Sequence, residues 1–449
     1  MTLELESVEL LYESLKHLNE GFSNLPDFTP KVDLERLQRV LGEVAERMRD
    51  NYPYPHPLYA GQMLKPPHPV ARLAYALAMW INPNNHALDG GRASSAMEKE
   101  AVAQIAQMYG WKDHLGHLCG GGTMANMEAL WVACQLHPGR KIVASSQAHY
   151  THRRISDVLQ LDFASVPIDS HARMDPKALE KILRQEDIGT VVATLGTTGC
   201  GAVDPLHELL DLQHHYGFRL HVDAAYGGYF ILVDNLDSHT RASFDVLNKA
   251  DSIVVDPHKH GLQPYGCGCV LFRDPAVGTL YKHDSPYTYF SSNELLHLGE
   301  ISLECSRPGA AAVGLWATLR LMPLVKSGEF AEDLARCRDA ACDLFKRLKD
   351  DNRFLTVFPP ELDIIVWAPR ASKSSTISKL SKAYFEQAAK AHLHLALVDL
   401  PAELARPHWT GVSFDAPTVT CLRSCLMKPE HFEWIDKIWH ILKRIADTN

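Results

Sequence analysis

The stretch SIVVDPHKHG, residues 252–261, decides the fold, because it runs from a short apolar strand directly into a lysine, Lys259. Proline, histidine and glycine surround this lysine and hold it in one place. Desolvation at the end of a buried strand favours the nucleophilic amine that forms a Schiff base. A single lysine is more often a solvated loop residue, so the interpretation depends on what else the sequence places at the same edge.

A second stretch, HVDAAYGG at residues 221–228, puts a carboxylate, Asp223, at the end of another buried-type strand. Ligands of parallel sheets bind at the C-terminal ends of the strands, where both Asp223 and Lys259 are expected. One fixed amine and one fixed carboxylate are what pyridoxal phosphate requires, as a Schiff-base lysine and a partner for the pyridinium nitrogen. The two stretches together predict a site for pyridoxal 5'-phosphate.

Short apolar runs alternate with helical stretches from about residue 116, as in a parallel sheet with crossover helices. The strand-like pieces are 141–145, 164–168, 190–196, 218–223, 252–256 and 268–272. The helix-like pieces are 123–136, 176–185, 205–216 and 241–249. This alternation predicts an α/β fold.

The segments before and after this region do not show the same alternation of strands and helices. Their helices and strands are expected at 3–18, 32–50, 69–81, 94–109, 311–324, 330–349, 363–367, 376–391, 395–398, 419–426 and 430–446. The first two helices cannot form a domain alone. A proline-rich connector at 51–59 cannot be helical. We therefore divide the chain into a dimer-forming helical arm with its connector (1–65), a large cofactor-binding domain (66–325) and a small C-terminal α+β domain (326–449).

Composition argues against several classes of function. The 449-residue chain has a formal net charge of −9, which disfavours a nucleic-acid-binding surface. No apolar run approaches the roughly 18 residues of a membrane span, and the acidic N-terminus lacks a secretory leader. Ten scattered cysteines and 24 histidines without a zinc-type spacing predict a cytoplasmic protein with reduced thiols and no metal site.

Other residues acquire a role only if a cofactor is present. Glycines 120–122 precede a helix at Thr123, and such a turn holds a phosphate through backbone N–H groups and the helix N-terminus. His149 follows the strand at 141–145, where an imidazole can stack on an aromatic ring. Thr198 leaves the next strand through a glycine turn that places hydroxyls near a ring substituent.

Two arginines, Arg307 and Arg423, each occupy an apolar setting. An arginine in such a place either binds a substrate carboxylate with two parallel hydrogen bonds or forms an internal salt bridge. The sequence leaves both alternatives open for each of them. The aromatic, irregular segment at 281–298 is typical of a mobile lid, and a tyrosine on a lid can donate a proton after bond cleavage.

HVDAA (221–225) followed by PHK (257–259) resembles the group II pyridoxal-phosphate-dependent amino-acid decarboxylases. That family includes the aromatic-amino-acid, glutamate, cysteine-sulfinate and histidine decarboxylases, and the similarity spans most of the chain from about residue 50. The resemblance implies the aspartate-aminotransferase-like fold type I, with a large, mostly parallel-sheet domain and a small C-terminal domain. It also implies an obligate homodimer with active sites at its interface, which converts a small L-amino acid into an amine and CO₂.

The resemblance assigns roles by position. Lys259 is the Schiff-base lysine, Asp223 the pyridinium partner and His149 the histidine stacked on the ring, with Ala225 against the opposite face. Thr198 matches a threonine near the ring hydroxyl and the substrate. The remaining matches are Thr123, Met124 and Ala125 in the phosphate turn, His258 beside the phosphate, and Tyr287 or Tyr289 as the lid tyrosine.

The two residues that flank the PHK motif differ from the family pattern. Asp256 stands where many members have asparagine, and an acid near a phosphate needs a donor between them. His260 stands where many members have tryptophan. Both departures place the chain nearer the bacterial and archaeal branches.

The substrate is less well indicated. The segment HPLYAGQ (56–62), which holds Tyr59 and Gln62, aligns with the family's substrate pocket, where glutamate and cysteine-sulfinate decarboxylases carry a glutamine. Arg423 matches an arginine that binds the substrate carboxylate in the glutamate enzymes. Both matches favour an acidic amino acid, whereas tyrosines at 52 and 54 would suit an aromatic ring.

Three rival functions follow from the same motifs. SRPG (306–309) also resembles the lyases that cleave sphingosine phosphate, so a Cα–Cβ lyase is one alternative. An aldehyde-forming oxidative decarboxylase is another. An inactive regulatory homologue is the third, and the intact set of Lys259, Asp223 and His149 argues against it.

Overall fold

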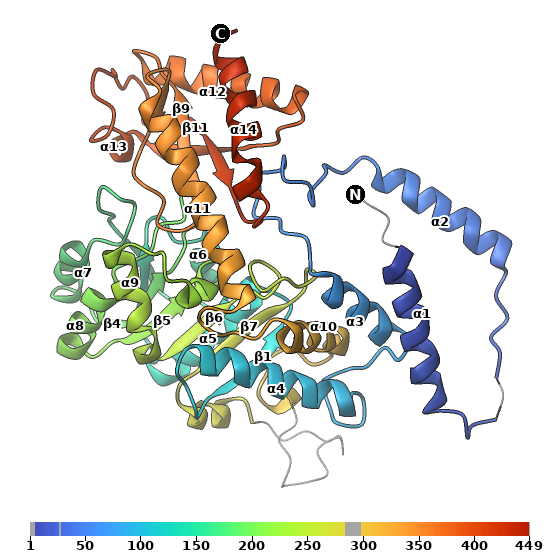
Figure 1. The fold of residues 1–449 in the computed structure, drawn as a ribbon. Helices are drawn as coiled ribbons and strands as arrows, with labels where there is room; N and C mark the ends of the chain where they lie inside the picture. The colour runs from blue at the N-terminus through green and yellow to red at the C-terminus, as the bar shows by residue number, and fades with distance from the viewer. Residues whose placement is uncertain (1–4, 27, 283–297, 449) are drawn as a thin grey trace.

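Two β-sheets organise the chain in the computed structural model, which describes residues 5–26, 28–282 and 298–448 (Figure 1). The large sheet has seven strands in the order β1-β7-β6-β5-β4-β2-β3. The strands are β1 (Leu115–Cys119), β2 (Lys141–Ser145), β3 (Phe163–Val166), β4 (Ile188–Thr194), β5 (Arg219–Asp223), β6 (Ser252–Val255) and β7 (Gly268–Phe272). Neighbours pair in parallel except at β7, which is antiparallel to β6 and β1. This arrangement confirms the predicted α/β fold of type I.

Helices and short 3₁₀ turns connect these strands and cover the sheet. They are α5 (Gly122–Leu136), α6 (Thr151–Val158), α7 (Pro176–Leu183), α8 (Leu206–Tyr216), η1 (Gly228–Leu232), α9 (Ser238–Asp245), η2 (Leu247–Lys249), η3 (Pro275–Leu280) and η4 (Leu298–Glu300). All seven residues of β4 are buried, because helices cover a parallel sheet on both faces. The core contains Val191, Leu220, Val222 and Ile253 from neighbouring strands.

A helical layer beside β1 and β7 comes from both flanks of the sheet. Its members are α3 (Pro69–Met79), α4 (Arg92–Met108) and α10 (Gly309–Leu321). α10 packs against both α3 and α4, so segments from either side of the sheet in sequence meet in space. Among the described residues, no helix is both long and apolar enough to cross a bilayer.

The small sheet lies in the C-terminal part, at the top of Figure 1. Its four antiparallel strands have the order β10-β11-β9-β8. The elements are α11 (Glu329–Asp350), β8 (Phe354–Thr356), β9 (Ile364–Pro369), α12 (Ser374–Lys390), β10 (Ala396–Pro401), α13 (Ala402–Ala405), β11 (Thr418–Cys425) and α14 (His431–Ala446). The division of the chain at residues 65 and 325 stays a prediction.

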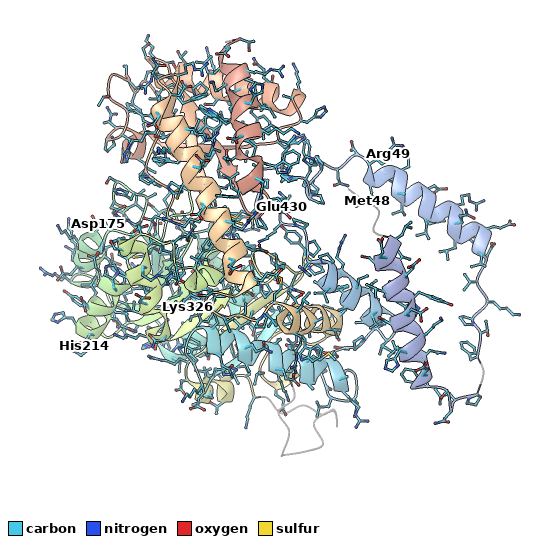
Figure 2. The ribbon with its side chains drawn as sticks, viewed as in Figure 1. Met48, Arg49, Asp175, His214, Lys326 and Glu430 are labelled. Carbon is cyan, nitrogen blue, oxygen red and sulfur yellow. The ribbon has the colours of Figure 1, made fainter. Side chains whose placement is uncertain are left out.

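The N-terminal arm, α1 (Leu5–Glu20) and α2 (Leu34–Met48), has no buried residue in either helix. α1 contacts α3, whereas α2 extends away from the rest of the chain, with Met48 and Arg49 at its end (Figures 1 and 2). Large apolar side chains of α2 are exposed, namely Leu34, Leu37, Val40, Leu41, Val44 and Met48. Nothing in the described chain covers this apolar stripe.

Among the α-helices and strands of the described residues, four were not expected from the sequence: β1, α6, β8 and α13. β1 has the sequence LGHLC, whose glycine and histidine interrupt the apolar run. α6 has the sequence THRRISDV, in which too few apolar residues recur at helical spacing. β8 and α13 are only three and four residues long, which is too short for periodicity to reveal.

Candidate active site

A cavity of about 580 Å³ opens where the parallel strands of the large sheet end. Its lining comes from the turn before α5, the segment between β2 and α6, the ends of β4 and β5, and the loop after β6. The predicted site residues that line it are Thr123, Met124, His149, Thr198, Asp223, Ala225, Asp256, His258 and Lys259. Ala125 does not line the cavity but lies behind the turn, where its N–H donates to the Gly121 carbonyl at 3.0 Å.

Asp223 is the last residue of β5, and its carboxylate is held on both sides. His152 Nε2 lies 2.8 Å from Oδ2, and the Ala225 N–H donates to Oδ1 at 3.1 Å. Burial alone would raise the pKa of Asp223, but the His152 hydrogen bond and the charges of His152 and Lys259 outweigh it and keep the pKa well below its ordinary value. Asp223 is therefore an ionised carboxylate at the bottom of the cavity.

Lys259 lies in the turn that follows β6. Its Nζ lies 3.0 Å from Oδ2 of Asp256, and its side chain is 22% exposed. Asp256 is itself buried, and its second oxygen, Oδ1, has no hydrogen-bond partner within residues 5–26, 28–282 and 298–448. The amine is thus oriented within the cavity by an acid that keeps one unused oxygen.

The glycine turn at residues 120–122 joins β1 to α5. A Cβ on Gly122 would lie 2.7 Å from Oδ2 of Asp256, and Gly121 has a φ of +144°. The chain of β7 comes equally close, since a Cβ on Gly268 would lie 2.5 Å from the Gly121 carbonyl carbon. Only glycines fit there, and they leave the N-terminus of α5 open to an anion.

Two histidines, His149 and His258, line the cavity. Burial lowers the pKa of both His149 and His258. Nδ1 of His149 lies 2.7 Å from the Thr151 hydroxyl. Nδ1 of His258 donates to the Cys267 carbonyl at 2.8 Å, and its ring lies 4.8 Å from that of Tyr265. Both rings are therefore held in place by local contacts.

Arg423, on β11 of the small sheet, reaches the rim of this cavity. Its Nη1 donates to the Thr198 carbonyl at 2.7 Å and its Nη2 to Oε1 of Gln62 at 2.6 Å. The structure thus brings Arg423, Gln62 and Thr198 together, although only Thr198 lines the cavity itself. Tyr59 is buried nearby, where its hydroxyl accepts from the Gln62 N–H at 3.3 Å and its carbonyl accepts from Lys428 Nζ at 2.7 Å.

Arg307 is placed elsewhere, and here the structure favours the internal salt bridge. Its Nη1 lies 2.8 Å from Oε1 of Glu98 and also donates to the Leu118 carbonyl. Glu98 in turn accepts from the Leu118 N–H and from Asn85 Nδ2. Arg307 does not line the cavity, because its guanidinium is engaged by this buried carboxylate. Its expected role in binding substrate is therefore not supported.

Sequence reasoning did not identify the residues that hold Asp223 and the turn from behind. His152 is fully buried in α6, one turn after His149. His221 bonds Asn126 of α5 through Nε2 and Ser252 of β6 through Nδ1, and burial lowers its pKa to about 3. The spacing of His149 and His152 was the only available signal. Tyr287 and Tyr289 lie outside the described residues.

These residues fit pyridoxal phosphate. An ionised carboxylate, a lysine amine and a glycine-lined helix N-terminus face one cavity, and the buried atoms Asp256 Oδ1 and Thr194 Oγ1 have no hydrogen-bond partner among the described residues. A phosphorylated pyridine aldehyde offers groups for each of them.

The family model described as the pyridoxal-dependent decarboxylase conserved domain matches residues 124–368. A probable L-tyrosine/L-aspartate decarboxylase of Methanothermobacter thermautotrophicus is 28% identical over 313 residues, which cover 68% of this chain and 82% of that protein. An L-aspartate decarboxylase of Thermococcus kodakarensis is 30% identical over 286 residues, 63% of this chain and 72% of that protein. An L-tyrosine decarboxylase of Enterococcus faecium is 25% identical, covering 81% of this chain and 77% of that protein.

Solved structures share the fold at lower identity. Oryza sativa TDC with PLP and tryptamine aligns with a TM-score of 0.80 at 18% identity, covering 99% of this chain and 96% of that one. Mouse CSAD in apo form aligns with a TM-score of 0.78, also at 18% identity, and covers 99% of both chains. The two-sheet architecture described above is therefore shared over the whole chain.

Proposed function

We propose a substrate class and residue roles for this chain, which belongs to the pyridoxal-dependent decarboxylase family and is a pyridoxal-phosphate-dependent amino-acid carboxy-lyase. The proposed substrate is an acidic L-amino acid of the aspartate, glutamate or cysteine-sulfinate type. The observation that carries this proposal is Arg423, a buried guanidinium at the rim of the cavity without a carboxylate partner among the described residues.

The contacts of Arg423 support an incoming anion. It donates to a backbone carbonyl and to an amide oxygen, and its Nε has no hydrogen-bond partner in the part of the chain that the structure describes. A buried guanidinium is costly without an opposite charge, and a carboxylate satisfies it with two parallel hydrogen bonds. Since Thr198 lines the cavity and binds Arg423 through its carbonyl, the side-chain acid of a substrate is within reach of the arginine.

An aromatic substrate is the second candidate, because the relatives include tyrosine decarboxylases. The tyrosines of the connector give it little support. Tyr52, Tyr54 and Tyr59 pack on one another, with ring centroids 5.0–6.4 Å apart. None of the three lines the cavity, so they do not form an aromatic pocket in it.

The roles proposed for the large-domain residues follow from their contacts. Bound pyridoxal phosphate supplies an electron sink for the bond that is broken when CO₂ leaves. Lys259 provides the amine that anchors it, and Asp223, ionised and positioned by His152, keeps a proton on the pyridine nitrogen. His149 would cover the ring, and the turn at residues 120–122 with Thr123 and His258 would hold the phosphate, since all of these residues line the cavity. Tyr287 or Tyr289 is proposed to donate the proton that replaces CO₂.

We also propose that the chain acts as a cytoplasmic homodimer. The exposed apolar stripe of α2 is an unpaired surface, and pairing it with a second copy removes that surface from water. All ten cysteines are free thiols, which supports a reducing compartment. Light scattering of the full chain should give a dimer mass, and Leu37→Glu with Leu41→Glu should weaken it. A monomeric wild-type chain at micromolar concentration would contradict the dimer.

The test of the reaction is a substrate screen of the purified enzyme with bound cofactor, measuring CO₂ and amine for aspartate, glutamate, cysteine sulfinate and tyrosine. We expect release from an acidic substrate and none from Lys259→Ala, which should also lose the visible absorption band of the lysine-linked cofactor. Preference for tyrosine would overturn the substrate proposal. Aldehyde and ammonia formed only with oxygen would establish oxidative decarboxylation instead, and cleavage without CO₂ would establish a Cα–Cβ lyase.

A further inference from the structure

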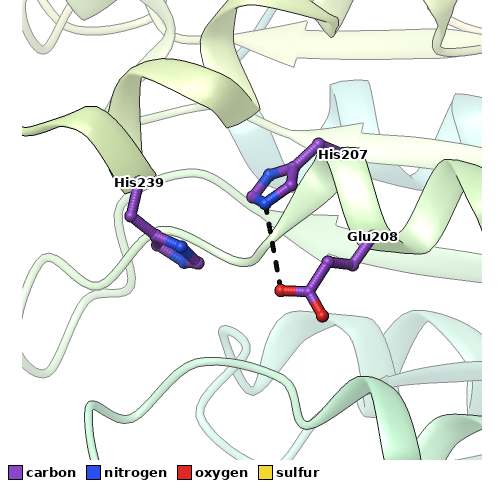
Figure 3. A group of neighbouring side chains, drawn as sticks. All are labelled: His207, Glu208 and His239. Atoms are coloured by element: carbon purple, nitrogen blue, oxygen red, sulfur yellow. Dashed lines mark ion pairs between the residues drawn. The ribbon is translucent and has the colours of Figure 1, made fainter.

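We propose that His207, Glu208 and His239 form a binding site for a divalent transition-metal ion of the zinc type, outside the catalytic cavity (Figure 3). His207 and Glu208 lie in the first turn of α8, and His239 lies in the first turn of α9. One donor atom from each residue lies within 4.8 Å of those of the other two. Two imidazoles and one carboxylate are a ligand set that zinc accepts, with water completing the coordination.

Ser243 determines which nitrogen of His207 is free. The Ser243 hydroxyl donates its single proton to the Asp204 carbonyl at 3.0 Å and accepts from the Leu206 N–H at 3.1 Å. Its contact with His207 Nδ1, at 3.4 Å, therefore receives a ring N–H. In the neutral ring, a proton on Nδ1 leaves a lone pair on Nε2, and this second-sphere bond is typical of metal-binding histidines.

The free nitrogen faces a carboxylate. Nε2 of His207 lies 3.9 Å from Oε1 of Glu208, the contact marked by the dashed line in Figure 3. The Nε2 lone pair and the Glu208 carboxylate are both hydrogen-bond acceptors, so neither can donate to the other, and a cation between them would interact with both. A proton on Nε2 would also allow the contact, and titration with metal ions distinguishes a bound metal from a proton. The Glu208 side chain is 50% exposed, so it is free to move toward an ion held by bonds of about 2 Å.

His239 adds a third donor. Its Nε2 is shielded from solvent and has no hydrogen-bond partner among the described residues. The ring of His239 packs edge-on against that of His207, with 5.2 Å between ring centroids. A metal ion uses the nitrogen that the chain leaves unpaired.

The role that fits this position is structural. None of the three residues lines the catalytic cavity, and the ion would tie α8 to α9. The same junction holds Asp204, whose carboxylate accepts the N–H of Met174 and of Thr194, and Thr194 does line the cavity. The bound ion would thus stabilise the segment that leads from β4 to α8.

The test is a titration of the chelator-treated enzyme, with its pyridoxal phosphate bound, using Co²⁺ and Zn²⁺ alone as probes. Calorimetry and the visible Co²⁺ spectrum give the number of ions bound per chain. We expect the double variant His207→Gln/His239→Gln to bind one ion fewer than wild type. Glu208→Gln, which keeps both imidazoles, should bind the ion at least tenfold more weakly.

His214→Gln is the matched control, because it removes an exposed histidine from the same helix, α8. It should bind as wild type does, and Zn²⁺ should raise the melting temperature of wild type and of this control but not of the double variant. Equal ion counts for wild type and a folded double variant would overturn the proposal. Unchanged affinity in Glu208→Gln would remove the carboxylate from the site.

Discussion

Two arginines are buried to the same extent but differ in the partners of their guanidinium groups. Arg307 and Arg423 are both 5% exposed. Arg307 has a carboxylate of its own chain, Glu98, at 2.8 Å. Arg423 has only a carbonyl and an amide oxygen, and no acidic partner among the described residues.

The difference shows where the chain neutralises a buried positive charge with its own acidic residue. Around Arg307 the charge is balanced internally, and Glu98 accepts further N–H groups from Leu118 and Asn85. That cluster joins α4 to β1 and so stabilises the fold. Around Arg423 no described acid balances the charge, and in the proposed function the substrate supplies it.

The largest expected effect is on stability at Arg307. Arg307→Met leaves Glu98 buried without its cation, and breaking such a pair costs about 3–5 kcal/mol. Denaturant unfolding should show this loss in the free energy of unfolding. Arg320→Met, which removes an arginine paired with Glu100 on the surface, should cost no more than about 1 kcal/mol. If the two variants lost the same amount, Arg307 would not be the structural partner of Glu98.

A smaller effect, on catalysis, is expected at Arg423. Arg423→Met should lower kcat/KM for an acidic substrate by about 2–3 kcal/mol, roughly 30- to 150-fold, because hydrogen bonds to a charged group are lost. The free energy of unfolding should change by less than about 1.5 kcal/mol, since no buried ion pair is broken. Steady-state kinetics and unfolding of the same preparation measure both. Unchanged kcat/KM would refute the assignment of Arg423.

The substitution Gln62→Glu would give Arg423 a carboxylate partner, as Glu98 is for Arg307. The new carboxylate would stand where Oε1 of Gln62 lies now, 2.6 Å from Nη2 of Arg423. It should compete with the substrate acid and lower kcat/KM by about 1–2 kcal/mol. Gln62→Met removes the same hydrogen bond without adding a charge and should lower it less. A higher kcat/KM of the Gln62→Glu variant would contradict the proposed difference between Arg307 and Arg423.

The smallest expected effect is stabilisation by a dicarboxylate that lacks an amine. Succinate at a concentration equal to its Kd should add about 0.4 kcal/mol to the free energy of unfolding of wild type. The Arg423→Met variant should show no such gain. A thermal-shift titration with propionate as the monocarboxylate control measures this. Equal stabilisation of both proteins would place the bound anion elsewhere.

Most of the fold was predictable, because buried parallel strands such as 190–196 and 252–256 are continuous apolar runs. The placement of Asp223 and Lys259 at one edge of the sheet was predictable for the same reason, since Asp223 ends such a strand and Lys259 follows another. Their roles toward the cofactor stay predictions. The elements that were missed are those whose residues follow no clear period, such as β1 and α6. His152 was missed because a buried partner of a carboxylate carries no local pattern.

The two arginines mark the limit of what sequence can decide. Both stand in apolar runs, and only the three-dimensional structure shows that Glu98 reaches one of them. The group of His207, Glu208 and His239 has the same origin, since its residues lie on two different helices. Pairings between distant segments are set by the packing of whole elements, which the spacing of residues along the chain does not record.

The position of Arg423 has a consequence for how such a protein can diversify. Its contacts join the connector, through Gln62, to the large domain, through Thr198, while Asp223 and Lys259 stand on separate strand ends. With the role proposed for Arg423, mutations at residues 62 and 423 would redirect the choice of amino acid without changing Asp223 and Lys259. A lineage built this way would exchange substrates by a few steps at one rim of the cavity and keep its chemistry.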